Sequence, residues 1–215
     1  MLGNSSSAFD VGGEPGGLVA YFGYGSLVCR ATHRTEIVHA VPARLTGWRR
    51  TWRPRPDMPG FSAALLTVRE EPGAGCDGLL VFDRAENLAA IDAREARYRR
   101  VPVDASCLEF KEKMPADCPI WLYVAEEQLP IHREPPTILQ SYLDAVMLGF
   151  LQEHGEGGLA RFLAETHAFD LPIHADRNSP IYPRAVALEA PLSARFDTLL
   201  AERRGFRLVQ AGQAG

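Results

Sequence analysis

The sequence predicts an α+β fold in which strands come first and helices follow. Residues 18–125 contain short apolar and aromatic runs that are typical of buried strands, whereas apolar residues recur at helical spacing from residue 137 onward. With 215 residues, the chain has the length of one ordinary domain and can bury a core without metal or disulfide support. We therefore expect a single domain over residues 18–215, with a strand-rich core at 18–125 and a helical extension at 126–215.

Residues 1–17 are expected to form a disordered leader. They contain glycine and serine but lack the basic start and the apolar centre of a signal peptide. No later stretch approaches the roughly 20 apolar residues that a membrane helix requires. These features predict a soluble protein with no membrane partner.

Five strands and a helix are predicted in the core. Leu18–Phe22 reads as a buried strand, and the loop Glu71-Pro72-Gly73-Ala74-Gly75 makes its two flanking segments a hairpin candidate. Asp83 and Glu86 have the spacing of a capping box, which predicts a helix from about Arg84 to Arg94. Pro102 indicates an edge position or a strand start. The remaining predicted strands are 61–68, 78–82, 101–103 and 120–124.

Three helices are predicted in the extension. From Thr137 to Leu151, apolar residues recur at helical spacing, and glycines at 155, 157 and 158 end this helix. A second helix is expected over 159–169. A third is expected over 193–204, with Ser193 as its cap and Gly205 as its stop.

Charge and cysteine usage narrow the functional classes. Lys and Arg number 23 against 27 Asp and Glu, and the basic residues are spread in short groups, so we expect no nucleic-acid partner. The four cysteines show no C-x-x-C spacing and no paired metal-ligand spacing. They read as reduced thiols of a cytoplasmic protein, and the sequence does not indicate an oligomeric state.

The turn Tyr24-Gly25-Ser26-Leu27 is a candidate binding element. It follows a buried strand, and glycine there lets successive backbone amides point into one concavity, which suits a carboxylate or a developing oxyanion. The alternative is a tight turn that binds nothing, because glycine-rich strand ends are common.

Glu95 is a candidate acid/base residue. Leu88, Ile91 and Glu95 fall at i, i+3 and i+7, which places the carboxylate on the apolar stripe of the predicted helix. Burial there would raise its pKa above the reference value of about 4.3 and suit it to proton transfer near neutral pH. The alternative is that Glu95 lies beyond the helix and pairs with a nearby arginine on a solvated surface. The arginines in question are Arg94, Arg97, Arg99 and Arg100.

Taken together, several segments resemble the γ-glutamylcyclotransferase superfamily, including its ChaC branch. The segments occur in the family's order between about residues 18 and 125, and their joint occurrence is far more specific than either motif alone. They are Tyr21-Phe22-Gly23-Tyr24-Gly25-Ser26-Leu27, then Leu45-Thr46-Gly47-Trp48-Arg49-Arg50, Gly78-Leu79-Leu80, Arg94-Glu95, and Tyr98 leading into Val101.

The resemblance implies a small closed β-barrel of mixed strands flanked by helices, with a pocket between the turn and a catalytic glutamate. It implies that Tyr24, Gly25, Ser26 and Leu27 hold the γ-glutamyl moiety and that Glu95 is the acid/base. It implies that Tyr98 and Tyr123 also bind the substrate: Tyr98 matches a tyrosine that follows the glutamate in the family, and Tyr123 matches a tyrosine that lines the pocket. The implied activity is that of a lyase that cyclises a γ-glutamyl amine, amino acid or peptide such as glutathione to 5-oxoproline, with no cofactor and no metal.

Two other functions remain open at this point. One is a non-catalytic module that holds a carboxylate or amino-acid ligand, and the other is a related enzyme that removes γ-glutamyl groups from a biosynthetic intermediate. The polar segment 176–184 is favoured as a plain connection; the competing hypothesis is that it folds over the pocket mouth, where Arg177 or Arg184 grips a substrate carboxylate.

Two other candidates for a chemical role are not favoured by the sequence. His167, His174 and Asp176 match no common metal-ligand spacing. Cys29 has no base placed near it by the sequence, and a buried cysteine usually behaves as a small apolar residue.

Overall fold

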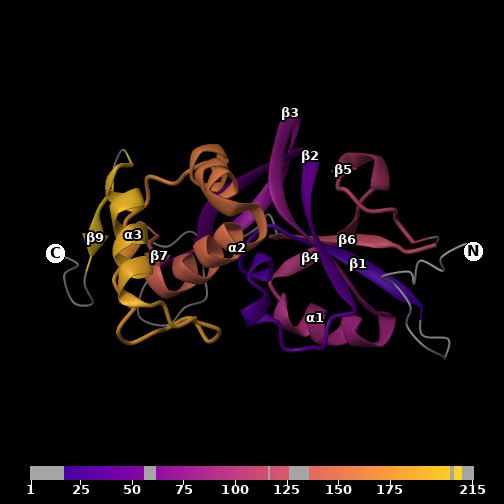
Figure 1. Ribbon diagram of the computed structural model, residues 1–215, viewed down its shortest axis with the longest axis horizontal. Helices are drawn as coiled ribbons and strands as arrows, with labels where there is room; N and C mark the ends of the chain where they lie inside the picture. The colour runs from indigo at the N-terminus through magenta and orange to yellow at the C-terminus, as the bar shows by residue number, and fades with distance from the viewer. Residues whose placement is uncertain (1–16, 56–61, 116, 126–135, 204–205, 210–215) are drawn as a thin grey trace, which may run out of the picture.

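The protein is built on a mixed sheet with helices beside it, in a computed structural model that describes residues 17–55, 62–115, 117–125, 136–203 and 206–209. Figure 1 shows most of the sheet in one half of the elongated molecule and the chain from residue 138 onward in the other half. The sheet has six strands in the order β4-β6-β1-β3-β2-β5. They are β1 (Leu18–Gly23), β2 (His39–Arg55), β3 (Ala63–Arg84), β4 (Tyr98–Pro102), β5 (Leu108–Glu109) and β6 (Ile120–Ala125).

The predicted first strand is confirmed and lies in the middle of the sheet. β1 pairs in parallel with β6 and antiparallel with β3. Its apolar run is buried because neighbouring strands cover both edges and side chains cover both faces. The strands predicted at 101–103 and 120–124 correspond to β4 and β6, and β4 is an edge strand, as Pro102 indicated.

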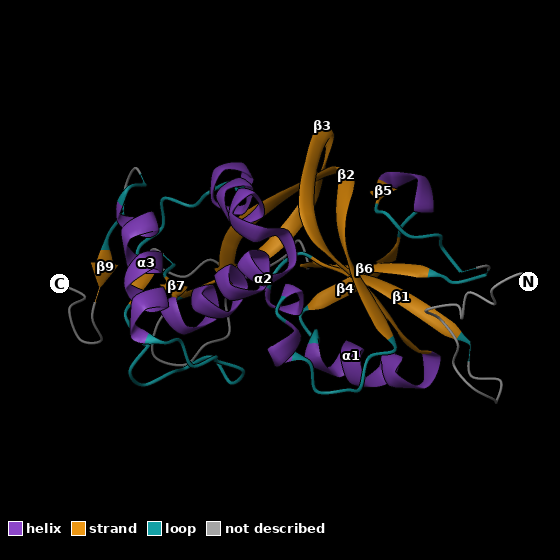
Figure 2. Ribbon diagram, in the orientation of Figure 1, coloured by secondary structure: helices purple, strands orange, loops and turns teal. Residues whose placement is uncertain are grey.

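The predicted hairpin around the loop at residues 71–75 is wrong. β3 passes through this loop as one 22-residue element and pairs antiparallel with β2 from His39 opposite Phe82 to Arg55 opposite Ala63. The register shifts between Thr46 and Trp48, where Gly47 has a φ of +79°, so the proline and glycines make an irregularity in a long ribbon instead of a chain reversal. This twisted two-stranded ribbon is prominent in Figure 2. Phe61 lies outside the described residues.

The closed barrel is not confirmed, because β4 and β5 are the two edges of the described sheet. The first half of β3 nevertheless bends over towards β4 and β6. The amide of Ala125 donates to Thr67 Oγ1 at 2.9 Å, and the hydroxyl of Tyr98 donates to the carbonyl of Leu66 at 3.0 Å. Side-chain bonds therefore link strands that no ladder joins.

The helix predicted from Arg84 begins later than expected. A 3-10 turn (Ala85–Asn87) precedes α1 (Leu88–Arg94). The predicted capping box is absent from this helix, because Asp83 Oδ1 accepts from the amide of Arg84 at 2.8 Å and from Asn87 Nδ2 at 2.6 Å. Asp83 thus holds the loop before the helix.

The helical extension is confirmed in outline. α2 (Gln140–Glu165) is interrupted at Gly155, whose φ of +64° separates the two helices expected on either side of the glycines. α3 (Ala190–Ala201) starts earlier than predicted, because Pro191 occupies its first turn and Ser193 Oγ donates to the carbonyl of Ala190 inside the helix. A small parallel sheet that was not predicted joins β7 (Ile138–Leu139), β8 (Ile173–His174) and β9 (Leu208–Val209).

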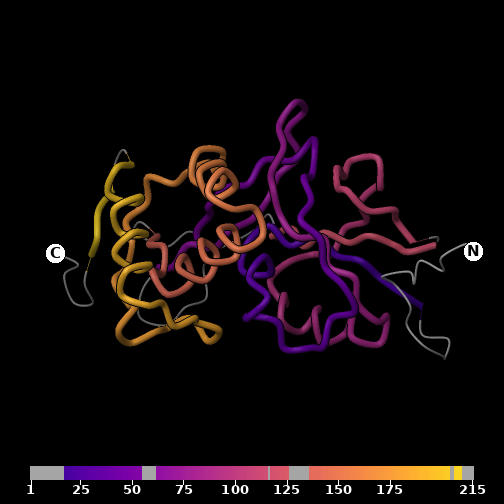
Figure 3. Tube along the Cα trace, viewed as in Figure 1, coloured from indigo at the N-terminus to yellow at the C-terminus, as the bar shows by residue number. Residues whose placement is uncertain are grey.

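The extension is attached to the sheet by backbone bonds and by a shared core. Trp52 and Ala64 donate their amides to the carbonyls of His167 and Thr137, respectively. The buried apolar residues of the sheet, α2 and α3 form one continuous cluster. The chain at Thr137 and at His167 therefore runs beside the β2–β3 ribbon, and the tube in Figure 3 shows this close approach. The division at residue 125 stays a prediction, and the predicted leader lies outside the described residues except for Gly17.

The helices that the structure describes include none with the length and apolar character needed to cross a membrane.

Candidate active site

The turn after β1 is held in shape by its own backbone and by neighbouring side chains. It forms a 3-10 turn (Ser26–Val28), in which the amide of Val28 donates to the carbonyl of Gly25. Thr32 Oγ1 donates to the carbonyl of Ser26 at 2.7 Å, and His33 Nε2 lies 2.9 Å from the carbonyl of Leu27. The carbonyls of Gly25, Ser26 and Leu27 therefore all have hydrogen-bond partners, which fix the conformation of the turn.

Helix α2 closes over this turn. A Cβ atom on Gly25 would lie 2.7 Å from the hydroxyl of Tyr142, and one on Gly149 would lie 2.5 Å from the amide nitrogen of Cys29. Both glycines permit a close approach between the turn and the helix. The backbone of Ser26 lies near the hydroxyl of Tyr142 and opposes the rise that burial causes in its pKa.

Glu95 is the residue that follows α1, with its amide bonded to the carbonyl of Ile91. Its carboxylate lies 3.0 Å from Arg94 Nε, and the two side chains are 15% and 5% exposed. The sequence left two alternatives, and each is partly correct. Glu95 does pair with an arginine just beyond the helix, but the pair is largely buried instead of lying on a solvated surface.

Arg94 also reaches the turn. Its Nη2 donates to Ser26 Oγ at 3.2 Å, and its Nη1 donates to the carbonyl of Thr32 at 2.8 Å. Arg94 thus connects the carboxylate of Glu95 to the turn. Among the arginines near Glu95 in the sequence, Arg94 thus has a largely buried side chain that does not point to solvent.

The turn and Glu95 line the same hollow. This inner hollow, of about 30 Å³, is bounded by all four residues of the Tyr24–Leu27 turn together with Glu95, Tyr98 and Tyr123. An outer cavity of about 320 Å³ adjoins it. Both are lined by Ser26, Leu66, Glu95, Tyr98 and Tyr142. The spatial arrangement required by the predicted site is present, while the roles of its residues remain predictions.

The tyrosines around the inner hollow have distinct partners. Tyr24 donates its hydroxyl to the carbonyl of Tyr123, and burial together with the charge of Glu95 raises its pKa well above the ordinary value. Tyr98 donates to the carbonyl of Leu66. Tyr123 donates to Asp92 Oδ1 at 2.7 Å, so its hydroxyl is committed to α1.

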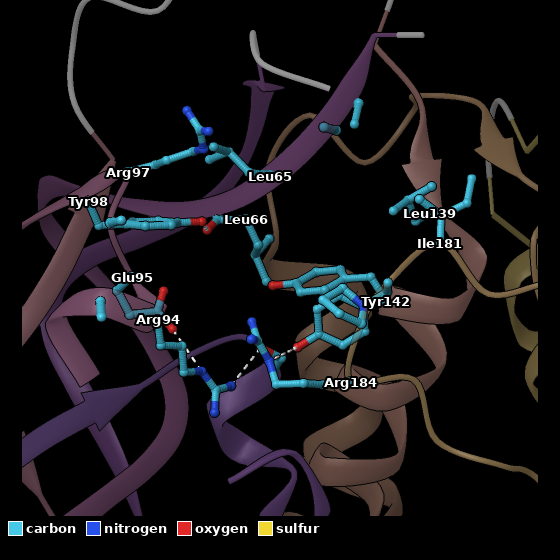
Figure 4. A pocket seen from close by; sticks show the side chains of 17 residues that line it. Leu65, Leu66, Arg94, Glu95, Arg97, Tyr98, Leu139, Tyr142, Ile181 and Arg184 are labelled. Carbon is cyan, nitrogen blue, oxygen red and sulfur yellow. Dashed lines mark hydrogen bonds and ion pairs between the residues drawn. The ribbon is translucent and has the colours of Figure 1, made fainter. Parts of the chain in front are cut away.

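Tyr142 was not predicted as part of the site. Its position in the apolar pattern of α2 indicated core packing, and its ring does pack edge-on against Trp52 and Tyr182. Figure 4 shows its hydroxyl directed into the cavity. Burial raises the pKa of Tyr142, with Tyr182 and Glu95 adding to the effect. The sequence does contain a signal for this role of Tyr142: a tyrosine on the buried face of a helix needs a polar partner for its hydroxyl.

The segment 176–184 does reach the cavity, through its last four residues. Ile181, Tyr182, Pro183 and Arg184 line the outer cavity. Arg177 lies elsewhere, in ion pairs with Asp144 at 2.7 Å and with Asp197 at 2.8 Å. The favoured prediction, a plain connection, therefore describes the first half of the segment. The second half fits the competing hypothesis better, because it lines the outer cavity.

The two other sets of candidate side chains are engaged in ordinary contacts. His167 Nδ1 lies 3.1 Å from Arg69 Nη2, and Asp176 Oδ1 accepts from the amide of Ser141. No three His, Cys, Asp or Glu side chains gather as a metal site within the described ranges. Burial raises the pKa of the Cys29 thiol, which does not favour a nucleophilic thiolate.

Comparisons with known proteins identify the fold. The chain superposes on a gamma-glutamyl cyclotransferase structure with a TM-score of 0.51 and 15% identity, over 85% of this chain and 99% of that one. An uncharacterized protein from Homo sapiens matches with a TM-score of 0.48 and 14% identity, over 84% and 98% of the two chains. A yeast gamma-glutamyl cyclotransferase specific to glutathione matches with a TM-score of 0.45 and 14% identity, over 87% and 97%.

The sequence matches no protein-family model and no curated protein. The likeness that these comparisons find is therefore a likeness in structure. The chain has the fold of the gamma-glutamyl cyclotransferase structure over 85% of its length.

Proposed function

We propose that this protein is a lyase that cyclises a γ-glutamyl amine, amino acid or peptide and releases 5-oxoproline and the free amine. The observation that carries the proposal is that Glu95 and the Tyr24–Leu27 turn line one hollow although they come from different elements. The shared fold with a gamma-glutamyl cyclotransferase supports it. The resemblance in the turn and around Glu95 is independent of that fold comparison.

The reaction needs positioning and proton transfer. The α-amino nitrogen of a γ-glutamyl group attacks its own γ-carbonyl carbon, a five-membered lactam forms, and the bond from that carbon to the departing nitrogen breaks. Well-oriented intramolecular attack has an effective molarity of about 10⁵ M or more. The protein therefore has to fix the folded conformer, and no cofactor is required for the step.

Glu95 is placed to move the proton. The α-ammonium of the free substrate, with a pKa of about 7.7–8.0, loses one proton to water before attack. Glu95 takes a second proton from the attacking nitrogen and delivers it to the departing nitrogen. The released amine then takes up a proton from water, so the two protons lost from the ammonium are balanced by two gained on the departing nitrogen.

The turn and Tyr142 supply hydrogen-bond donors. The inner hollow of about 30 Å³ has room for one small group such as a carboxylate or an oxyanion, so the rest of the substrate extends into the outer cavity. The hydroxyl of Tyr142 is directed into the outer cavity and can donate its proton to the ligand. Each such donor contributes about 3 kcal/mol if it faces the charge of the transition state.

The test is an assay for 5-oxoproline with glutathione, γ-glutamyl-alanine and γ-glutamyl-lysine as substrates. The proposal predicts release of 5-oxoproline from at least one of them. Binding without turnover would support the non-catalytic module instead. Transfer or hydrolysis of the γ-glutamyl group without 5-oxoproline would support the enzyme that removes γ-glutamyl groups.

A further inference from the structure

The outer cavity is chemically asymmetric. Figure 4 shows Arg94 and Glu95 on one side and Leu139 and Ile181 on the other, with Arg184 extending into the space between them. The apolar side includes Ala63, Ala64 and Leu65 from β3. A ligand that fills this cavity therefore meets charged groups near Glu95 and an apolar wall farther away.

Cations outnumber anions around this cavity. Its described lining contains Arg94, Arg97 and Arg184 but only one acid, Glu95. Arg94 is neutralised by its ion pair with Glu95. Arg184 adds a positive charge to this lining, which favours an anionic group on the part of the ligand that lies beside it.

Arg184 is the arginine best placed to bind that anionic group. Its Nε donates to the hydroxyl of Tyr182 at 3.1 Å, and its guanidinium carbon lies 5.2 Å from the centre of the Tyr182 ring. The ion pairs formed among the described residues give Arg94, Arg100 and Arg177 carboxylate partners but include none for Arg184. A tyrosine thus orients its guanidinium, whose two terminal nitrogens can form a bidentate contact with a carboxylate.

The segment that carries Arg184 is fixed to the helices. Asp176 accepts from the amide and hydroxyl of Ser141 and from the amide of Ile181. Arg177 pairs with Asp144 on α2 and Asp197 on α3. These contacts hold the segment at the mouth of the cavity, so the position of Arg184 is set by the fold.

We infer that Arg184 binds a carboxylate on the departing part of the substrate, so that the substrate is a γ-glutamyl amino acid or peptide and not a simple γ-glutamyl amine. This inference rests on the proposed function. The turn residues other than Ser26 line only the inner hollow, whereas Arg184 lines only the outer cavity. A γ-glutamyl group held at the turn therefore places the departing part beside Arg184.

The test compares two substrates that differ only in the carboxylate, γ-glutamyl-leucine and γ-glutamyl-isoamylamine. The leucine side chain suits the apolar wall of Leu139 and Ile181 and is present in both compounds. For the unmodified protein, we expect kcat/KM to be roughly 10- to 100-fold higher for γ-glutamyl-leucine. In Arg184→Gln this preference should disappear, because the amine substrate keeps its rate and the leucine substrate loses its advantage. Arg184→Lys should retain part of the preference, because the charge remains but the bidentate geometry is lost.

Arg195→Gln is the matched control. This arginine lies on α3, pairs with Glu156 and does not line the cavity. It should leave both substrates unaffected. Equal rates for the two substrates in the unmodified protein, or an equal loss for both in Arg184→Gln, would overturn the inference while leaving the cyclisation intact.

Calorimetric binding separates this inference from the proposed chemistry. Glu95→Gln and the double variant Glu95→Gln/Arg184→Gln are titrated with the same two compounds. Tighter binding of γ-glutamyl-leucine that is lost with Arg184 supports carboxylate recognition even if no 5-oxoproline is ever released. Equal binding of both compounds by Glu95→Gln contradicts it.

Discussion

The guanidinium of Arg94 joins Glu95 to Ser26, with Nε 3.0 Å from Glu95 Oε1 and Nη2 3.2 Å from Ser26 Oγ. A side chain adjacent to the proposed acid/base therefore also contacts the proposed binding turn. We regard Arg94 as a positioning residue, because it acts through the two elements it connects.

Replacing Arg94 should affect both stability and turnover. Arg94→Gln removes the ion pair between Arg94 and Glu95, whose side chains are 5% and 15% exposed. The free energy of unfolding should fall by about 3 kcal/mol, as measured by urea denaturation. kcat for 5-oxoproline release should fall on the order of 100-fold, because the carboxylate is no longer held in one orientation.

Two variants control for this effect. Arg94→Lys should recover part of kcat, since it restores the charge beside Glu95. Arg195→Gln, which breaks an exposed pair with Glu156, should behave like the unmodified protein. A normal kcat in a folded Arg94→Gln variant would show that Arg94 does not position the carboxylate.

Gly25 and Tyr142 are predicted to be energetically coupled. The Cβ atom of Gly25→Ala would meet the Tyr142 hydroxyl at 2.7 Å, whereas its other neighbours, from Leu66, lie at 3.5 Å or more. The single variant should lose about 1–3 kcal/mol of stability through overpacking. In the Tyr142→Phe background the same change should cost at least about 1 kcal/mol less. A double-mutant cycle by denaturant unfolding measures the coupling, and strictly additive effects would contradict it.

The turn should weaken in acid through His33. Burial lowers the pKa of His33, with Arg94 adding to the effect against the hydrogen bond to Leu27. Because the folded pKa lies below the unfolded value of about 6.5, the unfolded chain binds more protons between the two values. The stability that His33 contributes is complete above about pH 6.5 and is lost as the pH falls towards the folded pKa.

The measurement compares unfolding free energies at neutral and mildly acidic pH in the unmodified protein and in His33→Gln. The glutamine amide can still donate to the carbonyl of Leu27 but cannot be protonated in this range. We expect the variant to lose less stability on acidification. Identical losses in both proteins would show that His33 does not contribute to the pH dependence.

Local sequence signals predicted the elements that frame the site. The apolar run of β1 and the glycines beside Tyr24 indicated a buried strand ending in a turn, and the spacing of Leu88, Ile91 and Glu95 placed the carboxylate towards the interior. Both signals depend on residues within a few positions of one another. These predictions hold in the folded chain because the local sequence pattern and the burial in the tertiary structure agree.

The rest depends on contacts between distant residues. Pro72 and Gly73 are residue types typical of a chain reversal. β3 nevertheless continues past them, because it pairs with β2 on both sides, at Glu70 and at Gly75. The sequence likewise could not separate Arg177 from Arg184, because both stand in the same polar segment. In the folded chain, Asp144 on α2 and Asp197 on α3 form ion pairs with Arg177. Arg184 lines the outer cavity instead.

The most direct test of the proposed function is the rate of 5-oxoproline release by Glu95→Gln. Glu153→Gln is the matched control, because Glu153 also pairs with an arginine, Arg30, and does not line either cavity. The proposal predicts that Glu95→Gln retains a cooperative unfolding transition and loses about 10²- to 10⁴-fold in kcat, while Glu153→Gln remains active. A folded Glu95→Gln protein that cyclises its substrate at the unmodified rate would contradict the proposal.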